Sequence, residues 1–232
     1  MNALCLQFAV VFLAVAAMAQ TGQPSEVEIT AEPSHHPALQ NKYVRVFQVE
    51  ADPQKSTLVH RHRHDYIFVT LGDTEISNEE VGKAPVAVKL KDGEVRFVAG
   101  NFAHRVRNVS KTTFRNVTIE FLQDGKPSAK RWDEDRALHV LHGGTEDVLF
   151  VKDGARVSEV ELQIAGVLPK HKHSGPQLLV AVTDLELRDD IVGKPATNLE
   201  MKSGDIRWFD EGLTHTVTNV GRQGAKFVTV EF

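Results

Sequence analysis

The sequence predicts an all-β chain of two tandem domains, each a β-sandwich or a closed β-barrel. Two observations predict this class. The chain matches itself at one constant offset, which places residue 42 on residue 153, and each copy consists of short segments rich in β-branched and aromatic residues, separated by glycine turns. The 232 residues are 41% hydrophobic and 25% charged, which is an ordinary globular composition and enough chain for two cores of normal size.

The segment 1–19 is predicted to be a signal peptide. The uncharged apolar run "LCLQFAVVFLAVAAMA" ends in Ala17-Met18-Ala19, and polar sequence follows at once, although no Lys or Arg precedes the run. We expect cleavage after Ala19 and a secreted or periplasmic protein of bacterial type. A membrane anchor is the alternative, but the run is short for a span. Cys5, the single cysteine, lies in this segment, so the mature chain would contain no disulfide.

The internal repeat sets the predicted domain boundaries. Residues 42–121 align with residues 153–232 without a gap, and 23 of the 80 aligned positions are identical. A repeat of this length is a whole small domain that has been duplicated, rather than a solenoid unit. We therefore expect an N-terminal domain at 20–122, a charged connector at 123–150 and a C-terminal domain at 151–232.

Each copy reads as a series of short strands. Segments such as "YVRVFQVE", "YIFVTLG", "VAVKLKDG" and "FRNVTIEF" show rough period-two alternation, and turns are marked at Gly72, Gly93 and Gly204. The best helical candidate is "DEDRALHVLH", 133–142, inside the connector.

Three histidines recur at the same spacing in both copies. His60 and His62 form an H-x-H pair that His104 follows, and His171, His173 and His215 are their counterparts at the same intervals. In a strand, alternate side chains share a face, so H-x-H points two imidazoles the same way, and a third can return beside them in a closed sheet. Three neutral imidazoles suit a divalent transition metal (Fe, Mn, Ni, Co, Cu or Zn) and leave positions open for water or substrate.

His64 is not part of the repeated set, because its counterpart is Gly175. Strand parity would place His64 on the same face as His60 and His62. It is a candidate for an additional ligand, a proton-transferring catalytic residue, or a polar residue at the mouth of the site.

On these motifs the chain resembles the cupin family, and specifically the bicupins. The stretches "GEVRFVAGNFAHRVRN", 93–108, and "GDIRWFDEGLTHTVTN", 204–219, keep the Gly, His and Asn of the second cupin motif, while Ala99 and Asp210 replace its Pro. The resemblance covers nearly the whole mature chain and implies two jelly-roll antiparallel β-barrels, each with a metal on the H-x-H pair and the second-motif His.

The chain departs from the family at the motif glutamate. Four residues after H-x-H stand Tyr66 and Gln177, while Asp65 lies at the alternative spacing of three. Gln177 can coordinate through its amide oxygen, whereas Tyr66 is a poor ligand unless it is deprotonated, so Tyr66 is either a catalytic candidate or a core aromatic residue. Asp65 would need a bulge to reach the site. We therefore expect the second barrel to be the better metal site.

Two asparagines lie four residues past the second-motif histidines. Asn108 and Asn219 share a strand face with His104 and His215, so they are candidates for hydrogen-bonding partners of the ligands, or for buried residues that fix a turn.

The leading functional hypothesis is a metal-dependent enzyme, dioxygenase-like or isomerase-like, that acts on a small organic substrate. The alternative is a non-catalytic module that binds a sugar, an acid or a flavonoid-like ligand beside a structural metal, and a metal that only stiffens the barrels is a third reading. The formal net charge of −4 argues against a nucleic-acid partner, and no membrane partner is expected after cleavage. A homodimer remains open.

Overall fold

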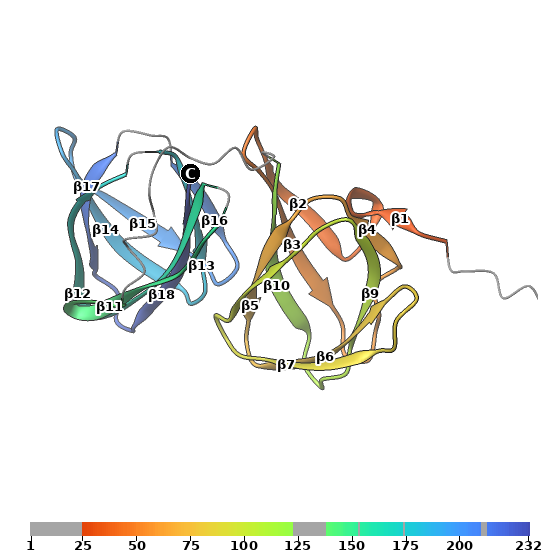
Figure 1. The fold of residues 1–232 in the computed structure, drawn as a ribbon. Coiled ribbons are helices and arrows are strands. Elements are labelled where there is room, and N and C mark those ends of the chain that lie inside the picture. The colour runs from red at the N-terminus through yellow and green to blue at the C-terminus, as the bar shows by residue number, and fades with distance from the viewer. Residues whose placement is uncertain (1–24, 123–137, 153, 174, 210–212) are drawn as a thin grey trace, which may run out of the picture.

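The computed structural model describes residues 25–122, 138–152, 154–173, 175–209 and 213–232. Two barrel-like halves lie side by side, the N-terminal half running from red to yellow-green and the C-terminal half from green to blue (Figure 1). The predicted signal peptide lies outside the described residues. Among the residues that are described, no helix is both long and apolar enough to cross a membrane.

The N-terminal half consists of two five-stranded sheets, with orders β1-β4-β9-β6-β7 and β2-β3-β10-β5-β8. A single 3-10 turn, η1 (Ile29–Ala31), follows β1. The strands of this half are β1 (Val27–Glu28), β2 (His35–Gln40), β3 (Val44–Ala51), β4 (His60–His62), β5 (Tyr66–Leu71), β6 (Thr74–Glu80), β7 (Val86–Leu90), β8 (Val95–Val98), β9 (Phe102–Asn108) and β10 (Phe114–Phe121).

The C-terminal half forms one sheet of order β15-β14-β17-β12-β18-β13-β16, with β11 also paired to β12. The sheet is continuous because the first part of the long β12 pairs with β18 and its last part pairs with β17. Its strands are β11 (Leu138–Lys152), β12 (Ala155–Lys172), β13 (Gln177–Ala181), β14 (Leu185–Ile191), β15 (Thr197–Met201), β16 (Ile206–Phe209), β17 (Thr214–Asn219) and β18 (Ala225–Glu231).

Strand order corresponds between the halves. The path β2-β3-β10-β5-β8 has the same chain order as β11-β12-β18-β13-β16, and β4-β9-β6-β7 corresponds to the end of β12 followed by β17-β14-β15. Gly93 and Gly204 both adopt positive φ (76° and 92°) in the turns before β8 and β16, a conformation that glycine adopts without strain. The all-β prediction and the tandem barrels are confirmed.

The helical prediction at 133–142 is wrong for its second half. Residues 138–142 begin β11, and residues 133–137 lie outside the described range. From His142 to Lys152, β11 pairs antiparallel with β12, and this tertiary pairing overrides a local helical propensity. The end of the expected connector therefore supplies a strand to the second barrel.

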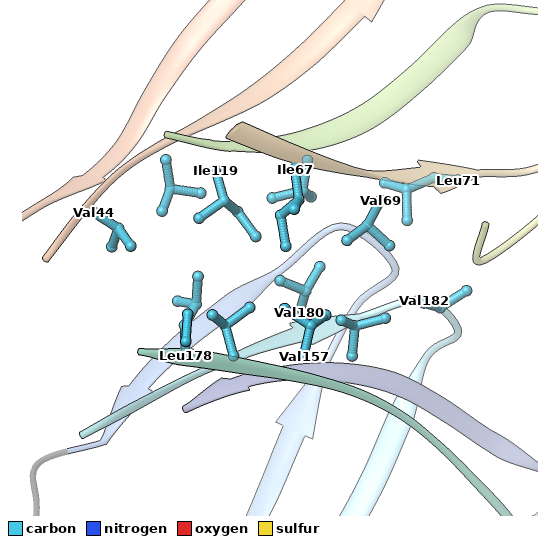
Figure 2. Close-up of a cluster of buried hydrophobic side chains, with 14 residues drawn as sticks. Val44, Ile67, Val69, Leu71, Ile119, Val157, Leu178, Val180 and Val182 are labelled. Atoms are coloured by element: carbon cyan, nitrogen blue, oxygen red, sulfur yellow. The ribbon is translucent and has the colours of Figure 1, made fainter. Parts of the chain in front are cut away.

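The largest hydrophobic cluster lies between the two halves. Figure 2 shows side chains from β3, β5 and β10 facing side chains from β12, β13 and β18 across two opposed sheets. The buried members are Val44, Val46, Ile67, Val69, Leu71, Val117, Ile119, Ala155, Val157, Leu178, Val180, Val182, Val228 and Val230. The same strands also face their own barrel interiors, which explains continuous apolar runs such as "LLVAV", 178–182.

Candidate metal centres

In the C-terminal half three histidines converge on one point. His171, on β12, pairs across the ladder with His215, on β17, and His173 follows two residues after His171. The three Nε2 atoms form a triangle with edges of 2.9, 3.0 and 3.1 Å. A metal ion about 2.0–2.1 Å from each nitrogen fits on the axis of such a triangle.

The opposite ring nitrogens fix the orientation of these imidazoles. His171 Nδ1 lies 2.8 Å from the Pro169 carbonyl oxygen, His215 Nδ1 lies 2.6 Å from Asp189 Oδ1, and His173 Nδ1 lies 3.4 Å from Glu231 Oε2. Carbonyl and carboxylate oxygens only accept, so Nδ1 of His171 and Nδ1 of His215 carry the proton and their Nε2 atoms present lone pairs, whereas the contact of His173 Nδ1 is too long for a hydrogen bond. Three imidazole nitrogens that converge at this separation can bind a cation, and the donor set fits a divalent transition metal.

A cavity of about 510 Å³ lies over this triad in the second barrel. Its wall includes apolar side chains and a few polar ones, among them Glu146 and Arg156, which are ion-paired at 3.2 Å. Gln177 lies on the same wall, is 3% exposed, and its Oε1 has no hydrogen-bond partner within the described parts of the chain. The amide oxygen that the sequence suggested as a ligand is therefore buried and unpaired on the wall of the cavity that the triad also lines.

The N-terminal half repeats the arrangement with wider spacing. His60 on β4 pairs with His104 on β9, and the ring centroids of His60, His62 and His104 are 4.7 to 5.2 Å apart. His60 Nδ1 lies 2.9 Å from the Leu58 carbonyl oxygen and His104 Nδ1 lies 2.6 Å from Asn78 Oδ1. The Nε2 atoms of His60 and His104 are buried without a hydrogen-bond partner in the described structure. Buried polar atoms usually have a partner, so these two nitrogens fit a role as metal ligands.

The first cavity is smaller, about 160 Å³, and its wall is aromatic. The Tyr66 ring stacks on the His62 ring at 4.0 Å between centroids, with an interplanar angle of 16°. Burial, together with the negative charge of Glu120, raises the pKa of the Tyr66 phenol above its usual value. The structure therefore places Tyr66 as a buried neutral ring on the wall of the site.

Strand parity does not extend to His64. β4 ends at His62, and His64 lies in a bend before β5, half-buried and not among the residues that line the cavity. The prediction that His64 shares the face of His60 and His62 is wrong, because the chain leaves the extended conformation after His62. Asp65 accepts a hydrogen bond from the Gly100 amide at 2.8 Å and lies 3.3 Å from Lys152 Nζ, away from the triad.

Asn108 and Asn219 fix turns and do not touch the triads. The Asn108 amide donates to the Ala51 and Thr112 carbonyl oxygens at 2.9 and 2.8 Å. Asn219 donates in the same way to three carbonyl oxygens at 2.8 to 3.3 Å, those of Leu162, Gln163 and Gln223. Of the two roles open to them, the turn-fixing one is confirmed and hydrogen bonding to the metal ligands is wrong, because their amides bond to the carbonyls of neighbouring chain reversals.

The residues that do contact the ligand histidines were missed by the sequence reading. Asn78 and Asp189 stand at matched positions of the repeat, as do Glu120 and Glu231, and Glu120 lies 3.4 Å from His62 Nδ1 just as Glu231 lies 3.4 Å from His173 Nδ1. The glutamate that both copies of the repeat keep, Glu120 and Glu231, was the sequence signal that could have identified these contacts. A fourth histidine, His35, lies upstream of the aligned region, and the group of ring nitrogens within 4.8 Å of one another in this barrel consists of His35, His60 and His62, without His104.

Comparison with known proteins supports the fold. No protein-family model matches the chain, and neither does any curated protein sequence. Among solved structures, oxalate decarboxylase from Bacillus subtilis at pH 4.6 superposes with a TM-score of 0.60 at 8% identity, over 82% of this chain and 68% of that chain. A second structure of oxalate decarboxylase, which describes its substrate binding mode, gives 0.60 at 8% identity over 88% and 76%. The chain has a cupin fold. A further structure of the Bacillus subtilis enzyme, reported for its Mn(II) centres, matches with a TM-score of 0.61, also at 8% identity and over 88% and 76%.

Metal binding by histidines depends on neutral imidazoles, and burial favours the neutral form of four of these side chains. Burial, with a smaller contribution from the nearby His35, lowers the pKa of both His60 and His62 to about 3. Burial likewise lowers the pKa of His104 and of His171. Neutral nitrogens with free lone pairs are therefore available to a divalent metal at ordinary pH.

The same shifts predict an acid-sensitive metal-free protein. His60 and His62 titrate near 6.5 when unfolded but near 3 when folded, so between these values the unfolded chain binds more protons. Stability should be complete above pH 6.5 and fall as the pH drops towards 3, by about 1.4 kcal/mol per pH unit for each such histidine. Urea unfolding in a chelator at pH 7 and pH 5 measures this slope, and His60→Gln should reduce it. An equal free energy of unfolding at both pH values would contradict the prediction.

Asp189 is expected to support the second metal site from behind His215. Asp189→Ala removes the acceptor that lies 2.6 Å from His215 Nδ1, so the imidazole loses both its fixed tautomer and its orientation. We expect the metal affinity of the second barrel to fall about 10- to 100-fold. Competition with a chromophoric chelator measures the affinity. Asp190→Ala, which removes a carboxylate paired with Arg188 on the outside, is the matched control and should leave it unchanged.

Proposed function

We propose that the protein is a metal-dependent enzyme whose small organic substrate binds in the C-terminal barrel. The observation that carries this proposal is the combination of a convergent three-histidine triad with a cavity of about 510 Å³ directly over it. Three protein nitrogens leave coordination positions for other ligands, which is the arrangement of catalytic rather than closed structural sites.

The residues of the second barrel would have three roles: holding the metal, binding the substrate and limiting access of water. His171, His173 and His215 would hold the ion, and Gln177, whose unpaired amide oxygen lines the same cavity, would add a neutral oxygen or hydrogen-bond to the substrate. A bound divalent metal would supply Lewis-acid polarisation of a chelating substrate, and O₂ chemistry if it is redox-active. Leu168, Leu179 and Phe227 line the cavity with apolar surface, which limits water around the bound molecule.

The cavity wall also carries a charged pair that suits a polar substrate. Glu146 Oε1 and Arg156 Nη2 are 3.2 Å apart, and Glu146 Oε2 lies 3.4 Å from His139 Nδ1. An anionic or hydroxylated substrate could exchange contacts with this pair, and a dioxygenase-like or isomerase-like reaction is compatible with the site. The matching Bacillus subtilis structures are of an enzyme named for oxalate, which supports including small carboxylic acids among the substrates to be tested.

The test is turnover with and without metal. Protein stripped by a chelator and then reloaded with Mn²⁺, Fe²⁺, Co²⁺, Ni²⁺, Cu²⁺ or Zn²⁺ is incubated with small carboxylic acids, sugars and flavonoids, and products are detected by mass spectrometry. Turnover should require metal and should be lost in His171→Ala/His215→Ala, while His36→Ala, at an exposed histidine, retains it. Affinity for a ligand without turnover under any metal would instead support a non-catalytic binding module.

We also propose that the protein is exported. The apolar run that ends in Ala17-Met18-Ala19 supports removal of residues 1–19. Amino-terminal sequencing of protein recovered outside the cytoplasm should begin at Gln20, and an intact Met1 on the exported protein would overturn this assignment.

A further inference from the structure

His35 lies inside the first barrel, next to the predicted ligands. It is the first residue of β2, it is 7% exposed, and it lines the same cavity as His60, His62 and His104. Its ring centroid is 4.7 Å from that of His60, the same separation as between His60 and His104, and 6.2 Å from that of His62. One ring nitrogen from each of His35, His60 and His62 falls within 4.8 Å of the others, and His104 adjoins this group through His60 and His62, at 4.7 and 5.2 Å between ring centroids.

Glu32 orients His35 through a hydrogen bond with Nδ1, the way in which metal-binding histidines are usually oriented. Glu32 Oε2 lies 2.6 Å from His35 Nδ1 and also accepts from the Ser34 amide at 2.8 Å, while Oε1 accepts from the Leu58 amide at 3.1 Å. A buried carboxylate that accepts three N–H groups is ionised, so Nδ1 of His35 carries a proton, and Nε2 is the nitrogen left to bind a metal. His104 with Asn78, and His215 with Asp189, have this same arrangement.

We propose that His35 is a metal ligand of the first barrel, which binds a divalent transition metal through four imidazoles, those of His35, His60, His62 and His104. This inference rests on the proposed function, because it takes His60, His62 and His104 to be ligands. Four protein nitrogens are the complement of closed, structural sites, and the small aromatic cavity of about 160 Å³ leaves little room for a substrate. The fourth imidazole takes the place of the glutamate that this barrel lacks.

The second barrel has no histidine at the corresponding position. Pairing of His35 with Val49 on β2 and β3 corresponds to pairing of Glu146 with Val160 on β11 and β12, at the same offset that relates the two copies of the repeat. Glu146 is engaged by Arg156 and His139 on the cavity wall. The two barrels therefore differ in one decisive side chain, so that the first site is closed and the second stays open.

The experiment isolates the first site in the full-length chain. In a His171→Ala/His173→Ala background, which silences the second triad, Co²⁺ is bound and the number of imidazoles around it is counted by X-ray absorption fine structure. Affinity for Co²⁺ is then measured by chelator competition for the background protein and for added His35→Gln, His36→Gln or His60→Gln. His36 is the exposed neighbour of His35 and serves as the matched control. Circular dichroism of each metal-free variant reports folding.

The background protein should show four imidazoles, and His35→Gln should show three and bind Co²⁺ at least about 10-fold more weakly, while His36→Gln matches the background. A count of three in the background protein, or His35→Gln binding as tightly as the background while His60→Gln loses the ion, would reduce His35 to the buried partner of Glu32 and overturn the proposal. The count needs no change at position 35, so it decides even if His35→Gln does not fold. If His60→Gln still binds Co²⁺ as tightly as the background protein, the first barrel does not hold the metal on these histidines, and this inference fails with it.

Discussion

Replacement of His173 by alanine is expected to remove the metal ion of the second barrel while the first barrel keeps its own. His173 Nε2 is the corner of the triad that lies 2.9 Å from His171 Nε2 and 3.0 Å from His215 Nε2, so its loss leaves only two histidine nitrogens to hold the ion. Loss of residues that merely orient a ligand costs about 10- to 100-fold in affinity, and loss of a ligand itself should cost at least about 100-fold.

Elemental analysis of the purified chain measures this effect directly. The unaltered protein should carry two ions per chain and His173→Ala one, with the remaining ion lost when His60→Ala is added. His36→Ala should retain both, because His36 is exposed and lines neither cavity. Two ions per chain in His173→Ala would show that this triad does not hold the metal.

The ligand histidines could be predicted from sequence because the two copies of the internal repeat can be compared with each other. Three histidines kept at equal spacing in two copies that are otherwise mostly different point to a shared chemical task, and the structure brings His171, His173 and His215 together with nitrogens about 3 Å apart. The all-β class followed from the same repeat and from the period-two strands.

The remaining parts of the sites depend on loops and on non-local pairing, which periodicity does not describe. His64 was placed by strand parity, but β4 ends at His62 and parity ends with it. Asn108 and Asn219 share a spacing with the ligands, yet their amides are used by neighbouring carbonyls, which only the folded chain reveals. His35 lies before the repeated segment and reaches the first site through the pairing of β2 with β3.

The helical prediction failed for a related reason. The charged residues 133–136 and the leucines at 138 and 141 have spacings that suit a helix, but β12 offers a partner strand to residues 138–152, and its ladder with β11 runs on to Lys152. Local preference is small compared with the hydrogen bonds and burial that a paired strand gains.

Leu178→Ala is expected to lower the free energy of unfolding by about 2–5 kcal/mol. Leu178, on β13, has no exposed surface and belongs to the cluster between the two halves, where it faces the sheet that carries Val44 and Ile119 (Figure 2). Truncation removes apolar burial and leaves a cavity between two sheets, and paired strands on both sides limit how far they can collapse to fill it. Denaturant unfolding of the metal-free protein measures the change, and the ligand histidines are not mutated in this variant.

The comparison that isolates this cost is Leu138→Ala, the same truncation at a side chain that is 61% exposed on β11. It should change the free energy of unfolding by no more than about 0.5 kcal/mol. Because the cluster joins both barrels, Leu178→Ala should also shift them together, so that fluorescence of Trp208 in the second barrel, read with Trp132 replaced by Phe, and circular dichroism of the whole chain follow one transition. A loss below about 1 kcal/mol, or an early transition confined to one barrel, would mean that the two halves are stable without each other and that the cluster joins them without stabilising either.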